Sequence, residues 1–152
     1  MVTTIGIDPH KATHTAVAID ESETVLGELT VPADRYQTTR LVDWAGKLNG
    51  NGRVWAVEAA GGLGYLLSQQ LVAREEEVID VPPVLASRVR VLSSGHSDKN
   101  DPNDARSVAI AALRQPGLAR VRREDHAQVL RILAKRHLEL TASRTQAVCR
   151  LH

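Results

Sequence analysis

Four acidic residues stand at positions from which the folded chain could gather them into one site for a divalent cation. Asp8 and Glu58 each end an apolar stretch that is typical of a buried strand, and Asp101 and Asp104 lie three residues apart at the expected start of a helix. Mg²⁺ prefers hard oxygen ligands, and two-metal phosphoryl transfer places several carboxylates around cations roughly 3.5–4 Å apart. We therefore predict that these four carboxylates converge on divalent metal.

Each acid also has a simpler interpretation. Asp101 and Asp104 would serve as the N-cap and a first-turn acid of a helix, because an Asp-Pro pair is a common helix start. Asp8 would be a turn former at the end of its strand, and Glu58 a solvated loop acid close to a pair of glycines. Asp98 is an alternative ligand in the loop that precedes the helix. From spacing alone, metal binding and these structural roles both remain open.

Histidine, lysine and cysteine restrict the chemistry further. The six histidines are not spaced as a cluster of metal ligands. His10 and Lys11 closely follow Asp8 and are candidates to contact a phosphate, although such residues also occur as plain surface polar groups. The single cysteine, Cys149, excludes an internal disulfide and a multi-cysteine metal site.

The stretch that ends in Asp8 is the first strand of the predicted fold. Apolar patterning predicts strands at 3–8, 14–20 and 24–31, and linkers this short favour an antiparallel meander. The elements predicted next are a helix at 35–48 with Asp34 as its N-cap, a strand at 53–58, a helix at 63–74, a strand at 77–81 and a helix from Pro82-Pro83 to about Leu92.

This order predicts an α/β fold, in which a mixed five-stranded sheet has helices on both faces. Right-handed crossovers place the strand at 53–58 beside the strand at 3–8, so that Asp8 and Glu58 end neighbouring parallel strands at the same edge. Ligands of such sheets usually bind at the carboxyl ends of the strands. The predicted topology therefore brings two of the four acids together.

Two more helices follow an exposed loop at 93–100. The first begins at Asp101 and continues to about Leu113, and the second runs from about Asp125 to the end. The last helix has a heptad seam, which favours a coiled coil, although an amphipathic helix packed on its own domain would show similar spacing. Because the pattern has no C-cap, we expect the chain to be part of a longer protein. The seam positions are Leu130, Leu133, His137, Leu140, Arg144, Ala147 and Leu151.

Composition indicates one globular domain with an appended helix. The chain has 152 residues, 43% of them hydrophobic and 24% charged, and an aromatic content of 3% leaves Val, Leu, Ile and Ala to build the core. No apolar run approaches the roughly 18 residues of a membrane span, and the N-terminus lacks a secretory pattern. Together with the single cysteine, these features predict a cytoplasmic protein without membrane contact.

Charge is distributed unevenly along the chain. Residues 1–87 hold 6 Lys and Arg against 12 Asp and Glu, a net charge of −6, whereas residues 88–152 hold 13 against 6, a net charge of +7. A basic second half favours a polyanionic partner such as nucleic acid. The alternative is a solvated, arginine-rich helical face.

Three stretches together resemble a known family. They are 6–11 (Gly-Ile-Asp-Pro-His-Lys), 57–59 (Val-Glu-Ala) and 99–105 (Lys-Asn-Asp-Pro-Asn-Asp-Ala). Their order, spacing and flanking residues are similar to those of the DEDD transposases of the 110-type bacterial insertion sequences, with which the Piv-like DNA invertases belong. The resemblance covers essentially the whole chain as the family's N-terminal domain. Asn100 departs from the family, which often has Thr there, and we expect no effect on metal binding.

The resemblance implies an RNase H-like (RuvC-like) fold and a role in insertion-sequence transposition. It implies that Asp8, Glu58, Asp101 and Asp104 are catalytic residues that bind Mg²⁺, for which Mn²⁺ can substitute. It also implies DNA as the substrate and a structured RNA as the guide of recombination.

The same resemblance implies a domain division. Residues 1–120 would form the catalytic domain, and residues 121–152 would begin a coiled-coil segment through which a dimer or tetramer assembles. The family carries a serine thought to attack DNA in a further C-terminal domain, which lies beyond this chain. The basic residues expected to hold nucleic-acid backbones are Lys11, Lys99, Arg106, Arg122 and Arg123.

Two other functions fit parts of the pattern. A non-catalytic fragment would bind nucleic acid through its basic half and dimerise through its heptads. An actin-like sugar kinase also has Ile-Gly-Ile-Asp on its first strand, but it needs Gly and Thr after the Asp to hold phosphate, whereas Pro9 and His10 stand there. The four acids favour the metal-dependent transposase domain.

Overall fold

A computed structural model of the chain describes residues 2–48, 52–94 and 101–151. Strands and helices follow one another in the order expected from the sequence. The elements are β1 (Thr3–Pro9), β2 (Thr13–Ile19), β3 (Val25–Pro32), α1 (Gln37–Ala45), β4 (Arg53–Glu58), α2 (Tyr65–Val72), β5 (Val78–Val81), α3 (Pro83–Ser94), α4 (Asp101–Arg114) and α5 (His126–Leu151).

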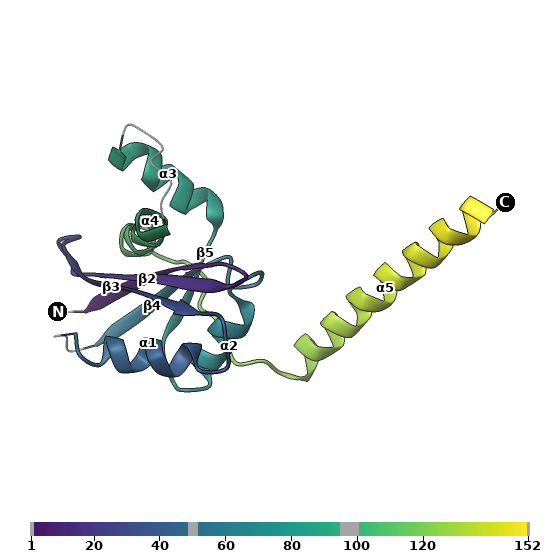
Figure 1. The fold of residues 1–152 in the computed structure, drawn as a ribbon, viewed down its shortest axis with the longest axis horizontal. Helices are drawn as coiled ribbons and strands as arrows, with labels where there is room; N and C mark the ends of the chain where they lie inside the picture. The colour runs from purple at the N-terminus through teal and green to yellow at the C-terminus, as the bar shows by residue number, and fades with distance from the viewer. Residues whose placement is uncertain (1, 49–51, 95–100, 152) are drawn as a thin grey trace. The chain divides into compact units, whose positions relative to one another are not determined.

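The five strands form one mixed sheet in the order β3-β2-β1-β4-β5. β1, β2 and β3 pair antiparallel, whereas β1 with β4 and β4 with β5 pair in parallel. The predicted meander and the predicted neighbouring of the first and fourth strands are both confirmed. β1 is the central strand of the sheet and is buried along its whole length (Figure 1). The residue at its carboxyl end therefore lies between neighbouring strands on both sides.

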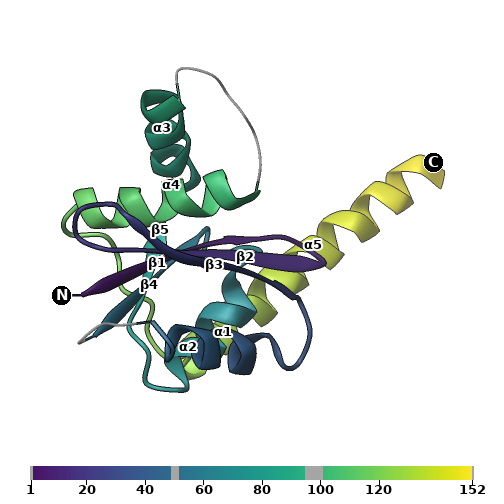
Figure 2. The same cartoon turned by 60° about the vertical axis from the view of Figure 1, so that its left-hand side comes forward.

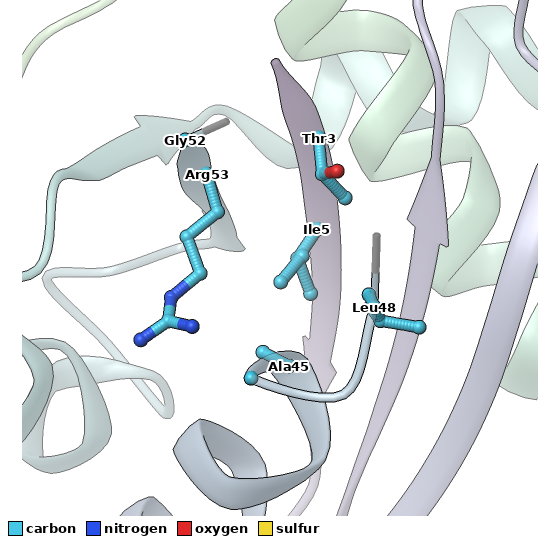
Figure 3. A pocket seen from close by; sticks show the side chains of 7 residues that line it. Thr3, Ile5, Ala45, Leu48, Gly52 and Arg53 are labelled. Carbon is cyan, nitrogen blue, oxygen red and sulfur yellow. The ribbon is translucent and has the colours of Figure 1, made fainter. Parts of the chain in front are cut away.

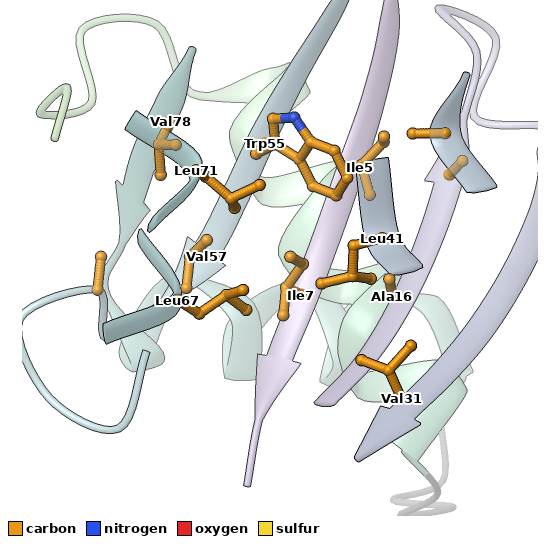
Figure 4. Close-up of a cluster of buried hydrophobic side chains, with 13 residues drawn as sticks. Ile5, Ile7, Ala16, Val31, Leu41, Trp55, Val57, Leu67, Leu71 and Val78 are labelled. Atoms are coloured by element: carbon orange, nitrogen blue, oxygen red, sulfur yellow. The ribbon is translucent and has the colours of Figure 1, made fainter. Parts of the chain in front are cut away.

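Helices α1 and α2 cover one face of the sheet (Figures 1 and 2). Ile5 and Ile7 of β1 and Trp55 and Val57 of β4 point to this side, where Figure 4 shows them in one apolar cluster. Each of these side chains is 0% exposed, and burying an Ile or Val side chain contributes about 1.5–3 kcal/mol. The leucines that the two helices add to this cluster are Leu41, Leu67 and Leu71.

Helix α4 covers the opposite face, with α3 packed against it (Figure 2). Gly6 of β1 faces α4, and a Cβ at this position would lie 2.1 Å from the carbonyl oxygen of Ala105 and 2.5 Å from the amide nitrogen of Ala109. Because real Cβ atoms do not approach so closely, only glycine lets the backbone of α4 rest directly on the central strand. The small side chains of Ala105 and Ala109 are fully buried at this contact.

Helix α1 is shorter than predicted at both ends. It runs over Gln37–Ala45 rather than 35–48, and the prediction of Asp34 as its N-cap is wrong, because Tyr36 occupies that position and no side chain caps the helix. The Asp34 carboxylate instead accepts a 2.8 Å hydrogen bond from the Tyr36 amide and forms an ion pair with Arg40, also at 2.8 Å. This local turn competes with the helix for the same backbone groups and delays its start.

Helix α2 is also shorter than the predicted 63–74. Hydrogen-bonded turns continue from β4 through Gly64, with the Gly62 amide 2.7 Å from the Ala59 carbonyl, so the helix begins only at Tyr65. The ends of the other predicted elements up to residue 92 lie within two residues of those in the structure. Most of the predicted loop at 93–100 falls outside the described residues.

Contacts divide the chain into two compact units, residues 1–122 and residues 123–152. The first contains the sheet with α1 to α4, and the second contains α5. Several apolar side chains of α5 are exposed, among them Leu130 at 64% and Leu133 at 60%. The coiled coil expected here stays a prediction. None of the helices in the described part of the chain is both long and apolar enough to cross a membrane.

Candidate active site

Asp8 and Glu58 lie side by side at the carboxyl edge of the sheet. Residues 3–7 of β1 pair in parallel with residues 53–57 of β4, so the two acids follow the last paired positions of neighbouring strands. Asp8 lies two residues after Gly6, and strand alternation therefore directs its side chain to the face that α4 covers. Asp8 is only 6% exposed.

The turn after Glu58 is held by β5. Ala59 adopts a left-handed conformation with φ of +48°, and its amide donates a 3.0 Å hydrogen bond to the Val81 carbonyl. The next amide, that of Ala60, donates a 2.8 Å hydrogen bond to the Asp80 carboxylate. A non-glycine residue in this conformation costs about 1–2 kcal/mol, which these hydrogen bonds offset. They fix the backbone at the point where Glu58 leaves its strand.

Helix α4 brings a third acid to the same edge. Because Gly6 lets α4 rest on β1, the first turns of this helix lie near Asp8. The Asp104 side chain is 15% exposed, and its charge contributes to raising the pKa of both Asp8 and Glu58. Asp101 is the first residue of α4, one turn before Asp104, and its side chain is outside what the structure describes.

The gathered carboxyl groups resist ionisation. Burial raises the pKa of Glu58 to about 7, and the neighbouring Asp8 carboxylate adds to this effect. Burial also raises the pKa of Asp8, while His10 acts in the opposite direction. The two carboxyl groups hydrogen-bond to each other, which requires a proton on one of them. A bound cation would relieve this crowding of negative charge.

Within the part of the chain that the structure describes, basic side chains from the β1–β2 turn and from α3 contact these acids. His10 Nε2 lies 3.0 Å from Asp8 Oδ2, with the His10 side chain 46% exposed. On α3, the Arg90 guanidinium forms an ion pair with the Asp104 carboxylate. The Arg90 side chain is 20% exposed, so this ion pair lies largely out of water.

The donor set suits a hard divalent cation, because every candidate ligand is a carboxylate oxygen. Within residues 2–48, 52–94 and 101–151, however, no three His, Cys, Asp or Glu side chains are already arranged to hold an ion. One oxygen of Asp104 is engaged by Arg90, and the Asp101 side chain is not described. The chemistry of the site therefore fits a divalent cation, and at Asp104 such a cation would meet the positive charge of Arg90.

A cavity of about 300 Å³ lies on the side of the sheet that α1 and α2 cover, and its wall includes Lys11 and His10, the residue that contacts Asp8. Leu63 and Leu66 line it as well and are 59% and 61% exposed. A wall that is partly basic and partly apolar suits a nucleotide, which combines an anionic phosphate with the flat apolar face of a base.

A buried polar network supports one wall of this cavity. His14 is 4% exposed, and its Nε2 lies 2.9 Å from Oε1 of Gln37. The Gln37 amide nitrogen donates to Gln70, and the Thr38 hydroxyl donates to the same Gln70 oxygen. Since Gln37 thus presents its carbonyl to His14, the proton of the imidazole sits on Nε2. Burial lowers the pKa of His14, in keeping with a neutral ring.

A second cavity, of about 200 Å³, lies at the opposite end of the sheet, where Thr3 and Arg53 begin β1 and β4 (Figure 3). Arg53 forms an ion pair with Glu76, whose carboxylate also accepts a 2.8 Å hydrogen bond from the Trp55 indole. The guanidinium is therefore part of a structural network, and this cavity is remote from the acids.

The basic residues predicted to hold nucleic acid are surface residues where the structure describes them. Lys11 is exposed beside the 300 Å³ cavity, and Arg106 is exposed on α4. Lys99, and Asp98 as the alternative ligand, lie outside the described residues. The other two exposed residues of the set are Arg122 and Arg123.

Sequence reasoning overlooked Arg90 and the network around His14. The signal for Arg90 is its place on α3, four residues after the buried Ala86 and next to the half-buried Val89, where an apolar residue is the usual choice. For His14, the sequence gives no signal, because its position in an apolar strand does not indicate which residues contact its ring. Its partners lie 23 residues or more away along the chain.

Comparison with known proteins identifies the family. The model of the IS110-type DEDD family, described as a transposase, matches residues 5–152. An uncharacterized 44.8 kDa protein of the insertion element IS116 of Streptomyces clavuligerus is 31% identical over 148 residues, which is 97% of this chain and 36% of that protein. An uncharacterized 42 kDa protein of the element IS900 of Mycobacterium paratuberculosis is 29% identical over 145 residues, 94% of this chain and 36% of that protein. The chain thus spans little more than a third of these relatives.

Among solved structures, two of Thermus thermophilus RuvC share the fold. RuvC in complex with a Holliday junction substrate aligns with a TM-score of 0.58 at 14% identity, covering 80% of this chain and 100% of RuvC. A second RuvC structure aligns with a TM-score of 0.56 at 15% identity, covering 78% and 99%. At this identity the likeness shows a RuvC-like, RNase H-like fold. With the family match over nearly the whole chain, it follows that this protein belongs to the IS110-type DEDD transposases.

Proposed function

We propose that this chain is the metal-dependent catalytic domain of an insertion-sequence transposase, which acts on DNA phosphodiesters. In this proposal Asp8, Glu58, Asp101 and Asp104 bind Mg²⁺, for which Mn²⁺ can substitute. The observation that carries the proposal is the approach of three acids from β1, β4 and α4 at one sheet edge, where Asp104 is close enough to raise the pKa of Asp8 and of Glu58. Membership of a transposase family supports DNA as the substrate, as does the fold shared with a RuvC bound to a Holliday junction.

Backbone contacts support three of the four proposed ligands. The parallel pairing of β1 with β4 sets the separation of Asp8 and Glu58, and the contact of Gly6 with α4 sets the approach of Asp104. Asp8, Glu58, Asp101 and Asp104 would hold the cations, which would supply polarisation of the scissile phosphate and stabilisation of charge on the attacking and leaving oxygens. Glu58 must lose its proton to act as a ligand, which the positive charge of a cation favours.

Basic and apolar side chains of the 300 Å³ cavity would hold the nucleic-acid strand. Lys11 supplies charge for a backbone phosphate, and Leu63 and Leu66 supply apolar surface for a base. The exposed arginines Arg106, Arg122 and Arg123 would add affinity that does not depend on sequence. The same contacts suit a structured guide RNA, which is part of the proposal.

The domain division completes the proposal. Residues 1–120 are the catalytic domain, and residues 121–152 begin a coiled coil that joins copies of the chain into a dimer or tetramer. The exposed leucines of α5 are the surface that such a contact would bury. A non-catalytic fragment that only binds nucleic acid and dimerises is the alternative.

Metal binding separates the proposal from this alternative. Mn²⁺ would be titrated by calorimetry into the wild type, Asp8→Asn, Asp104→Asn and the control Asp43→Asn, which changes an exposed acid on α1. We expect the wild type and Asp43→Asn to bind with equal affinity, and both site variants to lose binding at least tenfold. Equal affinity in all four proteins, or no binding in any, would contradict a shared site and favour the alternative.

A further inference from the structure

Arg90 holds a position at the acids that the proposed function leaves unexplained. Its guanidinium forms an ion pair with Asp104, and both side chains are largely withdrawn from water, at 20% and 15% exposure. Its charge also reaches Glu58, whose pKa it lowers against the raising effects of burial and of the neighbouring acids. Arg90 is thus the basic side chain of α3 that neutralises part of the acid cluster.

The backbone of Arg90 is anchored, whereas its side chain has rotatable bonds through which the guanidinium can reach another partner. Val89 packs against two groups of buried apolar side chains, one shared by α4 and β2 and the other by α4, β4 and β5. Ala86, one turn before Arg90, is 3% exposed, so α3 is anchored at this point. A long, partly exposed arginine on an anchored helix can move its guanidinium by rotating about side-chain bonds alone. The distance between α3 and the acids therefore need not change when Arg90 leaves Asp104.

A divalent cation and Arg90 would compete for the Asp104 carboxylate. The guanidinium is hydrogen-bonded to Oδ1 of Asp104, so its positive charge would repel a cation bound to the same group and lower the affinity for that cation. Removing the guanidinium from a largely buried carboxylate is costly unless both charges find new partners. The cation supplies one partner, for Asp104, and the released guanidinium needs an anion.

We propose that Arg90 is an exchangeable counter-ion of the acid cluster, which passes from Asp104 to a DNA phosphate when a divalent cation binds. The inference rests on the proposed function, because it takes Asp104 to be a metal ligand. Guanidinium and phosphate form strong bidentate pairs, so a phosphate at the site is the chemistry that fits the released side chain. Arg90 is a positioning residue in this scheme: it makes metal affinity and DNA affinity depend on each other.

The first test measures the metal alone. Mn²⁺ would be titrated into the 152-residue wild type, Arg90→Gln, Arg90→Lys and the control Arg88→Gln, which changes an exposed arginine on the same helix. We expect Arg90→Gln to bind Mn²⁺ about five- to twentyfold more tightly than the wild type, in the usual range of coupling between sites. Arg90→Lys should lie between the two, because lysine keeps the charge without the forked geometry, and Arg88→Gln should equal the wild type.

Two outcomes of this test are distinguishable. If Arg90→Gln binds Mn²⁺ no more tightly than the wild type, while Asp104→Asn still abolishes binding, Arg90 is a structural partner and only this inference fails. If neither the wild type nor Arg90→Gln binds Mn²⁺, the metal site itself fails and the inference fails with it. Should Arg90→Gln not fold, weaker Mn²⁺ binding by Arg90→Lys than by the wild type would overturn the inference.

The second test measures the coupling to DNA. The affinity for a fluorescent duplex of about 20 base pairs would be measured by anisotropy with and without Mn²⁺, at constant ionic strength because phosphate contacts depend strongly on salt. We expect Mn²⁺ to raise DNA affinity in the wild type and in Arg88→Gln. In Arg90→Gln, the factor by which Mn²⁺ raises DNA affinity should be at least five times smaller. An equal gain in all three proteins would overturn the transfer of Arg90 to a phosphate.

Discussion

Replacing Glu58 by glutamine should stabilise the metal-free protein above neutral pH. Burial and the neighbouring acids raise the pKa of Glu58 from 4.5 to about 7. Because the folded-state pKa is above the unfolded-state value, the folded protein holds this proton more tightly between these two pH values. Wild-type stability therefore falls as pH rises through this window and stays lower above it. Glutamine cannot ionise, and its amide can still donate to Asp8.

The size of the effect follows from the same shift. A rise from 4.5 to about 7 corresponds to at most about 3.4 kcal/mol, at 1.36 kcal/mol for each pKa unit. Glu58 is half-buried, so water and salt screen part of this penalty, and we reduce the expected gain in the free energy of unfolding to about 1–2 kcal/mol at pH 8. At pH 4.5 the wild type keeps most of the proton when folded, and the two proteins should differ by only a few tenths of a kcal/mol.

Urea unfolding in the presence of EDTA would measure both values. The variants would be the wild type, Glu58→Gln and the control Glu28→Gln, which changes an exposed acid on β3. Wild type and control should have the same free energy of unfolding at each pH. Two results would refute the argument from crowded carboxylates. One is a Glu58→Gln variant that is less stable than the wild type at pH 8, and the other is a difference in the free energy of unfolding between the two proteins that is the same at pH 4.5 and pH 8.

Two further predictions concern the helix contact and the nucleic-acid surface. Gly6→Ala should lower the free energy of unfolding by about 3 kcal/mol and weaken Mn²⁺ binding, because the new Cβ would meet backbone atoms of α4 that cannot move aside. Gly27→Ala, whose Cβ would meet only side-chain atoms at 3.4 Å or more, is the control in urea unfolding, and equal losses in the two variants would contradict the steric argument. Lys11→Gln should weaken DNA binding and reduce the slope of log affinity against log salt by about 1, since one phosphate contact is lost. Lys47→Gln, an exposed lysine after α1, should leave the slope unchanged, and a wild-type affinity insensitive to salt would contradict backbone binding altogether.

Much of the fold was predictable because short-range patterns determine it. Alternating apolar residues mark β1 and β4, and short linkers between the first three strands leave a meander as the favoured pairing. Handedness of the crossover then places β4 beside β1, which is enough to bring Asp8 and Glu58 to one edge. The same local rules were wrong at Asp34, where a turn and an ion pair with Arg40 outweighed the propensity of Asp for helix caps.

The sequence alone therefore determined which acids could meet, and the tertiary structure decided what surrounds them. That Gly6 touches the backbone of α4, and that Arg90 holds Asp104, depends on the packing of α4 against β1 and α3. Periodicity cannot reveal such contacts, because it reports which face of an element is buried and not which residue of another element lies against it. These long-range contacts set the charge balance of the site, and the ion pair between Arg90 and Asp104 is one of them.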